Sequence, residues 1–463
     1  MNFKELSLHS HALVVFDGLL KDPVFAGLQA LVDILADIQI LKKSEKEAVP
    51  GMEEAAIAAY GTFCAALFEQ SSARVVMSDT RDEKDTHIDL AAYIRDSILE
   101  DDNYYVQLRA RKAKIPSEIR RAVKEELALF QALSEITSKD VKAMIDYLRV
   151  DELEEEEAIG FHAEESPKAG DPEDPDAPAG ARAASAFLPT WVNSKIDLAK
   201  LYEKRMGEVH KTGFGIFAQF RAFTINEGGL APVPHPDQTT LSQLYGYERE
   251  RQMIIRNTEA LLAGEPASNL LLYGDAGTGK SSTIKAIAND YSEQGLRLVE
   301  VRKDQLFEIP NLIEALVTIP LKFILYIDDL SFTANDDNFS SLKGILEGSI
   351  SDKGDNIVVY ATSNRRHLVK ETMSDRDGDE LHVNDTLQEI SSLSARFGLT
   401  ITFQRPDHDE YLAIVDELAK QYGVLLPEDI LHTRAEAFAI RAGGRTPRAA
   451  KQFVELQRIG IYQ

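Results

Sequence analysis

A glycine-rich segment near the middle of the chain combines residue types that bind phosphate. Residues 274–281 read Gly-Asp-Ala-Gly-Thr-Gly-Lys-Ser, follow the apolar run 269–273 and precede a helical pattern. Glycines let a loop backbone wrap closely around phosphates, so that successive N–H groups point inward at a helix N-terminus. Lys280 can then reach the β- and γ-phosphates, and the Ser281 hydroxyl can ligate Mg²⁺. The alternative is a glycine-rich turn that binds nothing. The residues expected to hold the nucleotide are Gly274, Asp275, Ala276, Gly277, Thr278, Gly279, Lys280, Ser281 and Ser282.

Two adjacent carboxylates form the second chemical feature. Asp328 and Asp329 end the apolar run 322–327, and Asp328 comes 48 residues after Lys280. A buried strand that ends in acids places carboxylates at the carboxyl edge of a sheet, where open α/β folds bind ligands. We expect Asp328 to hold Mg²⁺ and Asp329 to orient or deprotonate an attacking water. A solvated strand end is the plainer interpretation of the pair taken alone.

The elements that must position these residues are a parallel sheet and its helices. Short apolar runs alternate with helical patterns, which is typical of a mostly parallel sheet with helices on both faces. The five expected strands are 269–273, 297–301, 323–327, 356–361 and 399–403. Three further helical patterns follow at 407–422, 427–442 and 447–459. The sequence therefore predicts an α/β fold with a five-stranded parallel sheet and a helical C-terminal segment.

The rest of the chain differs in composition. Helical spacing of apolar residues dominates the first 150 residues, and no motif with chemistry lies there. From Asp151 to Asp176, twelve acidic residues stand against Lys168, which predicts a self-repelling spacer or, as the alternative, an acidic interaction tail. The predicted parts are an all-helical N-terminal domain (1–150), an acidic disordered linker (151–185), a connector (186–237), the α/β core (238–404) and a helical lid (405–463).

Charge and cysteine content exclude several classes of function. The formal net charge is −25, which argues against non-specific coating of nucleic acid or of an anionic membrane. Cys64 is the single cysteine, so the chain has neither an internal disulfide nor a cysteine-rich zinc site. No signal peptide is visible, and charged residues interrupt the apolar stretch 11–40. We expect a soluble, cytoplasmic protein without a membrane partner.

Taken in chain order, these motifs resemble those of the AAA+ ATPases. A strand, phosphate loop and helix come first, then the strand that ends in acids, then Asn364 after a further apolar run. Arg396 in Ser-Ala-Arg-Phe and Arg448 in Gly-Arg-Thr-Pro-Arg follow. More narrowly, residues 190–463 resemble the bacterial AAA+ family catalogued as a domain of unknown function. The matching strings are GIFAQFRAF, GYERE, LLYGDAGTGKSS, DDLSF, LEGSI, ATSNRRHL, LSARFGL and GGRTPR.

The resemblance implies roles for single residues. Asn364 would position water near the γ-phosphate, and Arg448 would reach that phosphate from the lid. Arg396 would be an arginine finger that acts on the nucleotide of a neighbouring subunit. Tyr245 and Gly246 lie where the adenine pocket of the superfamily begins. The plainer alternatives are a strand-end asparagine, a helix-start arginine, an arginine that braces its own loop, and a tyrosine that only packs.

The resemblance also implies an activity. The chain would bind ATP and Mg²⁺, act as an ATPase in a homo-oligomeric ring or filament, and remodel or load a protein or nucleoprotein partner. Most relatives carry Glu where this chain has the shorter Asp329, so a slowly hydrolysing, nucleotide-dependent switch is the alternative. Nucleic-acid handling is a further one, and the basic run Arg365, Arg366, His367 and Lys370 is its only support in the core.

Overall fold

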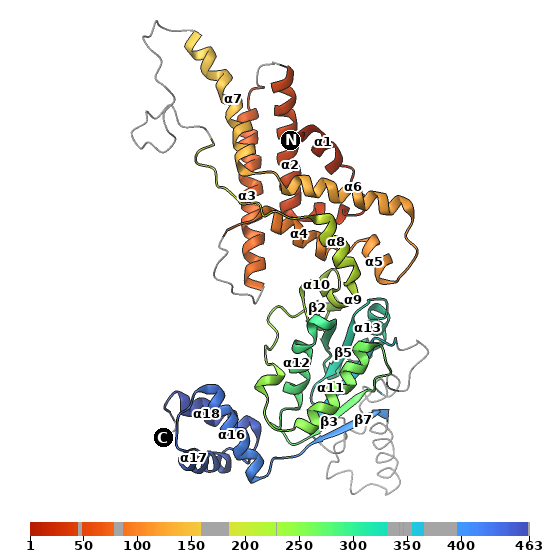
Figure 1. Ribbon diagram of the computed structural model, residues 1–463, viewed down its shortest axis with the longest axis vertical. Helices are drawn as coiled ribbons and strands as arrows, with labels where there is room; N and C mark the ends of the chain where they lie inside the picture. Colours follow the sequence, from red (N-terminus) through yellow and green to blue (C-terminus); the bar gives the residue numbers. More distant parts are fainter. Residues whose placement is uncertain are drawn as a thin grey trace. The chain divides into compact units, whose positions relative to one another are not determined.

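The structure is a computed structural model of the 463-residue chain. Its described residues are 1–44, 49–77, 87–158, 185–227, 229–330, 342, 346, 354–364 and 396–461 (Figure 1). The chain forms two compact units, Met1–Glu208 (unit 1) and Val209–Gln463 (unit 2).

The regular elements of unit 1 in its described residues are all helices, apart from an isolated bridge between Asp89 and Val192, which confirms the all-helical prediction (Figure 1). Its core contains large aromatic side chains that meet edge to face: the ring of Phe130 lies 5.7 Å from those of Phe16 and Phe25, and Phe16 lies 5.6 Å from Tyr202. Its helices are α1 (Phe3–Ser10), the 3₁₀ turn η1 (Asp17–Lys21), α2 (Pro23–Ser44), α3 (Met52–Met77), α4 (Leu90–Glu100), α5 (Tyr104–Ala110), α6 (Ser117–Ser134), α7 (Ser138–Ala158) and α8 (Leu198–Gly207).

One helix of unit 1, α2, is long and apolar enough to cross a membrane by length and composition alone. In the structure it packs against α1 and α3. Its side chains Leu28, Leu31, Val32 and Leu35 are buried there. Burial among protein side chains is what a core helix of a globular unit requires, so the packing accounts for the apolar character of α2.

Two stretches differ from the predicted parts. The helix α7 continues to Ala158, so the first eight residues of the predicted acidic linker are helical; five of the eight are Glu, which has a high helix propensity. Residues 159–184 of that linker lie outside the described residues. The first part of the predicted connector packs into unit 1: Trp191 Nε1 donates to the Ile136 carbonyl at 3.1 Å, and Leu198 and Tyr202 are buried. These apolar side chains explain why unit 1 extends to Glu208.

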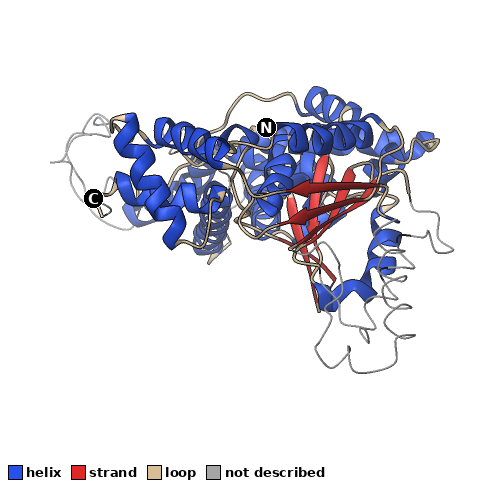
Figure 2. Cartoon of the chain, turned by 90° about the horizontal axis from the view of Figure 1, so that it is seen from below, coloured by secondary structure: helices blue, strands red, loops and turns tan. Residues whose placement is uncertain are grey.

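Unit 2 is built on a seven-stranded sheet in the order β2-β1-β4-β5-β6-β3-β7 (Figure 2). Only β1 and β2 pair antiparallel; the other neighbours are parallel. The five predicted strands are present, and the connector adds β1 and β2, the latter a Gly–Pro segment without strand propensity. The strands are β1 (Ala222–Asn226), β2 (Gly229–Pro232), β3 (Leu270–Gly274), β4 (Leu296–Glu300), β5 (Lys322–Ile327), β6 (Ile357–Ser363) and β7 (Leu399–Phe403).

Helices cover both faces of this sheet, and each face has its own core. Phe323 and Leu325 pack toward Ile309 and Leu316 of α13 on one face. On the other, Leu272 and Tyr360 pack with Ile254 of α11 and Ile284 of α12. The helices of the sheet region are α9 (Val209–Thr212), α10 (Ile216–Gln219), η2 (Leu241–Gln243), α11 (Glu248–Ala263), α12 (Lys280–Asp290), η3 (Ser292–Gln294), η4 (Lys303–Glu308) and α13 (Ile309–Leu316).

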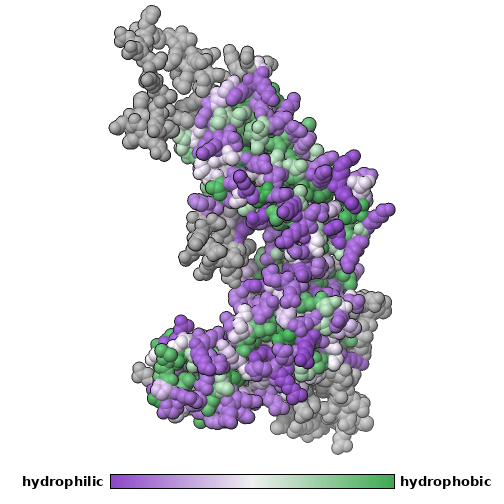
Figure 3. All heavy atoms as spheres, in the orientation of Figure 1, coloured by the Kyte–Doolittle hydropathy of each residue, from purple (hydrophilic) through white to green (hydrophobic). Residues whose placement is uncertain are grey.

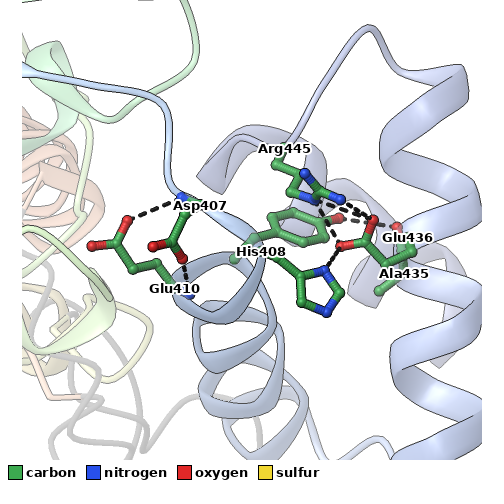
Figure 4. A network of polar contacts seen from close by, with 7 residues as sticks. Asp407, His408, Glu410, Ala435, Glu436 and Arg445 are labelled. Atoms are coloured by element: carbon green, nitrogen blue, oxygen red, sulfur yellow. Dashed lines mark hydrogen bonds and ion pairs between the residues drawn. The ribbon is translucent and has the colours of Figure 1, made fainter.

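Three further helices follow β7 in the described part of unit 2: α16 (His408–Tyr422), α17 (Glu428–Arg441) and α18 (Pro447–Arg458). Their shared core includes Tyr411, Ala435 and Phe453. A polar network ties their ends together (Figure 4): Asp407 and Glu410 form a capping box, while Arg445 and His408 both hydrogen-bond Glu436. The three predicted C-terminal helices are thus present as a small bundle.

Candidate nucleotide-binding site

The glycine-rich loop joins the end of β3 to the start of α12. Gly274, Gly277 and Gly279 have φ values of 145°, 81° and 93°, a region that side chains with a Cβ rarely adopt. A Cβ on Gly274 would lie 2.0 Å from the Phe403 carbonyl oxygen of neighbouring β7, so only glycine fits there. Nothing lies within 4 Å of the Cβ position of Gly279. The loop therefore packs tightly against the sheet at Gly274 and has free space around Gly279, just before the helix.

Lys280 begins α12, and its side chain folds back across the loop. Its ammonium donates to the carbonyls of Gly274 and Asp275 at 2.9 and 2.8 Å and to Asn364 Oδ1 at 3.0 Å. Burial lowers the pKa of Lys280, and the charges of the nearby aspartates oppose that shift. A buried ammonium held by neutral oxygens lacks a full countercharge, which a phosphate group would supply.

Asp328 lies beside the first turn of α12. Its Oδ1 accepts hydrogen bonds from the Ser281 hydroxyl at 2.8 Å and from the Thr362 hydroxyl at 2.5 Å. Burial raises the pKa of Asp328, but these bonds, together with Tyr326 and Lys285, outweigh it and hold the pKa below its usual range. A deprotonated carboxylate next to a hydroxyl is the hard oxygen donor set that Mg²⁺ prefers, so these residues fit that ion.

Asp329 adopts an unusual backbone conformation, with φ at +50°. Its N–H donates to Asp328 Oδ1 at 3.1 Å and to Thr362 Oγ1 at 3.0 Å, and Asn364 Nδ2 donates to its carboxylate at 2.8 Å. A left-handed non-glycine residue costs about 1–3 kcal/mol and persists where its surroundings fix it. The side chains of Asp329, Asn364 and Lys280 are therefore joined by consecutive hydrogen bonds, and these bonds fix the position of the Asp329 carboxylate.

Thr362 is a site residue that the sequence prediction missed. It lies near the end of β6, two positions before Asn364, which follows the last residue of the strand. Its hydroxyl contacts Asp328 and the N–H of Asp329. The signal in the sequence was a polar residue at i and i+2 at the end of an otherwise apolar strand.

These groups line one cavity of about 690 Å³, a size that suits a nucleotide. Its polar part is lined by loop residues 276–282, Asp328, Asp329 and Asn364; among the described residues, Gly274, Asp275 and Gly246 do not line it. Its less polar part contains Tyr245, Ile414 and Leu418, where an adenine ring has apolar surface to contact. A Cβ on Gly246, which has a φ of 75°, would lie 2.8 Å from Ile414 Cδ1, so this glycine lets the chain pass close to α16.

The helical bundle contacts the phosphate loop directly. The backbone N–H of Arg448, in the first turn of α18, donates to the Gly277 carbonyl at 3.2 Å, and Arg448 lines the cavity. Arg405, which the sequence prediction also missed, lies 3.6 Å from the Asp275 carboxylate and donates to the Gly443 carbonyl at 3.3 Å. Two arginines thus connect the loop to the bundle.

Arg396 lies apart from this cavity. It precedes β7, whose first residue Leu399 pairs with Leu270 at the start of β3, while the glycine loop follows the end of β3. Among the described residues, those that line the cavity do not include Arg396. The arginine is therefore placed at the sheet edge opposite its own loop. The basic run of residues 365–370 lies outside the described residues.

The fold and the site together define a P-loop AAA+ module: β3 and its loop lie between β6 and β7, two acids end β5, and a helical lid follows. The family model described as "Protein of unknown function (DUF815)" matches residues 217–458, and the chain belongs to this family. No curated protein matches the chain.

Solved structures with a similar chain trace include the Holliday junction branch migration motor RuvB of Thermotoga maritima. It has 17% identity and a TM-score of 0.33, with 48% of this chain and 67% of that chain covered. A variant of that protein with a proline replaced by glycine has 17% identity and a TM-score of 0.34, with 50% and 69% covered.

Proposed function

We propose that this chain is a Mg²⁺-dependent ATPase that couples ATP binding and hydrolysis to a conformational change. One observation carries the proposal: a cation, two carboxylates and an amide converge on one cavity beside a glycine loop. The four side chains come from three different elements of the sheet region: Lys280 from the start of α12, Asp328 and Asp329 from the end of β5, and Asn364 from the end of β6. Core packing does not require these polar groups to lie together at the edge of the sheet. Positioned charge of this kind is what phosphoryl transfer requires.

The binding residues follow from the contacts. Phosphate oxygens would replace the Gly274 and Asp275 carbonyls as partners of Lys280, because the ammonium gains more from an anion than from a neutral oxygen. Ser281 and Asp328 would hold Mg²⁺, which offsets phosphate charge. Asp329 and Asn364 would orient the attacking water, with Asp329 as the proton acceptor.

The contacts of Arg448 and Arg405 support coupling between nucleotide and lid. Both residues touch the loop that would hold the phosphates and also belong to, or contact, the helical bundle. A loop that changes partners on hydrolysis would therefore change its contacts with the lid. From the resemblance to AAA+ ATPases we further propose that the chain acts as a cytoplasmic homo-oligomer that remodels or loads a protein or nucleoprotein partner.

A second candidate function is a nucleotide-dependent switch that hydrolyses ATP slowly. It rests on Asp329: its carboxylate is short, and the left-handed backbone and the hydrogen bond from Asn364 fix its position. If that position does not match an attacking water, binding would be intact and turnover low, because a misplacement of about 1 Å can lower a rate about 10²-fold.

Two substitutions test the proposal against this alternative. Asp328→Ala should weaken Mg²⁺-dependent binding of ATP, whereas Asp329→Asn should bind ATP normally and release phosphate slowly. Fluorescent-nucleotide titration and steady-state phosphate release measure the two properties, and Asp304→Asn, an exposed aspartate on η4, is the control. Tight ATP binding without phosphate release in the unaltered chain at every concentration would favour the switch. Wild-type turnover in Asp329→Asn would show that Asp329 is not the base.

The ATP-bound Asp329→Asn chain also serves to identify a partner. A client that is released only after hydrolysis should accumulate on this variant and be absent from Lys280→Ala, which lacks the proposed phosphate ligand. Retention by both variants would show binding that is independent of the nucleotide. Such a result would argue against remodelling driven by ATP.

A further inference from the structure

Outside the nucleotide site, positive charge clusters in one part of unit 1. Residues 109–124 contain seven cationic side chains and one acidic side chain, Glu118, whereas the other residues of 1–150 contain twelve cationic and twenty-four acidic ones. We call this cluster the α5–α6 patch. Its cations are Arg109, Arg111, Lys112, Lys114, Arg120, Arg121 and Lys124.

The fold gathers these charges at one place. The patch spans the end of α5, the turn that follows and the first turns of α6. Hydrophilic and hydrophobic side chains are mixed over the visible face of unit 1 in Figure 3. A hollow of about 670 Å³ is lined by Lys114, Arg120, Arg121 and Lys124, among others. Burial and the charge of Glu203 raise the pKa of Tyr105, and the charges of Arg109 and Arg120 both oppose that rise. Arg109 of α5 and Arg120 of α6 therefore both lie close enough to Tyr105 to influence its pKa.

Most of these charges have no acidic partner among the described residues. Arg121 and Glu125 approach to 3.9 Å, and both are largely exposed, so that pair is worth little. Arg111, Lys112, Lys114, Arg120 and Lys124 are exposed as well. They support no core packing and no ion-pair network. Their mutual repulsion is a cost to folding that a bound polyanion would remove.

An exposed aromatic side chain at the other end of α5 indicates what kind of polyanion fits. Tyr104 is 60% exposed and lies seven residues, about two helical turns or 10 Å along the axis, before the exposed Arg111, so both side chains leave the same face of the helix. A positive track beside an aromatic face is the arrangement that binds single strands, because phosphates follow the cations and an unpaired base stacks on the ring. An acidic peptide or a duplex has no exposed base for that ring.

We propose that the α5–α6 patch binds the backbone of a single-stranded nucleic acid, with Tyr104 as a stacking platform. The net charge of −25 does not prevent this, because charges more than about 8 Å away are largely screened at physiological ionic strength. The site is separate from the nucleotide cavity. Binding of a single strand at the α5–α6 patch therefore does not depend on ATP hydrolysis.

The test uses the full chain and a fluorescent oligothymidylate of about 20 nucleotides, long enough for one site. Anisotropy titrations at about 50 and 200 mM NaCl give affinity and salt dependence, with a duplex of equal length and polyglutamate as the other probes. The patch variant is Arg111→Gln with Lys112→Gln and Lys114→Gln. The matched control removes three exposed lysines elsewhere in unit 1: Lys4→Gln, Lys21→Gln and Lys43→Gln.

We expect the patch variant to lose at least about tenfold in affinity and to reduce the salt slope by about two, since each lost phosphate contact removes about 0.7. The control should bind like the unaltered chain. Tyr104→Leu should lose about fivefold for the single strand and nothing for the duplex. Lys280→Ala should bind the strand normally, which separates this site from the nucleotide cavity.

Three results would overturn the proposal. Equal affinity for the duplex removes the single-strand assignment, and polyglutamate that binds as well as the oligothymidylate shows a general acidic-peptide surface. Equal losses in the patch and control variants show that overall charge, not this patch, is responsible. Circular dichroism of each variant confirms that the helices of unit 1 are retained.

Discussion

Both units of this chain contain acidic side chains that accept several hydrogen bonds, but they use them differently. In unit 1, the buried Glu126 accepts the backbone N–H groups of Val14, Val15 and Phe16 at 3.0–3.1 Å, and both of its oxygens are used inside the fold. In unit 2, Asp328 and Asp329 are fixed by neighbours yet remain exposed to a cavity. A carboxylate whose partners are all backbone groups serves folding, whereas one that is fixed but still open is free to serve a ligand.

The largest effect is expected at Arg396, which tests whether the cavity of unit 2 is complete in one subunit. Arg396→Ala should lower hydrolysis about 10³-fold or more at unchanged ATP affinity, because an arginine finger stabilises transition-state charge. Mixing this variant with Lys280→Ala should restore phosphate release if Arg396 acts on a neighbouring subunit. Co-assembled mixtures that stay inactive would contradict the action in trans.

A smaller but still large effect is expected at Lys280. Lys280→Ala should weaken ATP binding about 100-fold, since two charge-assisted hydrogen bonds to phosphate are lost. Lys211→Ala, an exposed lysine of unit 2 outside the cavity lining, is the matched control. Calorimetric titration measures both affinities. Unchanged affinity in a folded Lys280→Ala chain would exclude the loop as the phosphate site.

In unit 1, replacing Glu126 should change stability and leave the nucleotide site intact. Glu126→Gln puts an amide donor against backbone N–H donors and should lower the free energy of unfolding by about 3 kcal/mol. Trp191 is the only tryptophan and lies in the core of unit 1, so its fluorescence in urea reports that unit alone. Glu125→Gln, its exposed neighbour, is the control. A changed ATP affinity in the folded variant would contradict the conclusion that Glu126 serves only the folding of unit 1.

The smallest effect is a pH dependence in unit 1. Burial raises the pKa of Asp101 to about 6, helped by the charges of Asp102, Asp17 and Glu126 and opposed by the hydrogen bond from Asn103. The folded state thus binds more protons than the unfolded state between about pH 4 and pH 6, and stability falls as pH rises through that window.

Asp101→Asn should remove this dependence and raise stability by about 2 kcal/mol at pH 7.5, with no gain at pH 4. Urea unfolding followed by Trp191 fluorescence measures the difference, and Asp37→Asn, an exposed aspartate on α2, is the control. An equal gain at both pH values would show that the substitution acts through packing and not through ionisation.

The fold of unit 2 was largely predictable because its strands are buried on both faces. All seven residues of β6 are buried, and such a strand appears in the sequence as a continuous apolar run. β2 could not be found in this way, since Gly229–Pro232 pairs at the sheet edge and carries no apolar pattern. The end of unit 1 was missed for a related reason. Trp191 and Tyr202 contact partners more than fifty residues away in the chain, and no local pattern records such contacts.

For the site, the sequence alone determined what is encoded within short segments. The glycines, Lys280 and Ser281 form one contiguous motif, and the acids at the end of β5 follow from their own strand. Tertiary structure decided which distant groups join them: Thr362 reaches Asp328, Arg405 reaches Asp275, and the left-handed Asp329 is held by Asn364. The physical reason is that a motif depends on neighbouring residues, whereas a hydrogen bond between strands depends on register, and packing of the whole sheet sets that register.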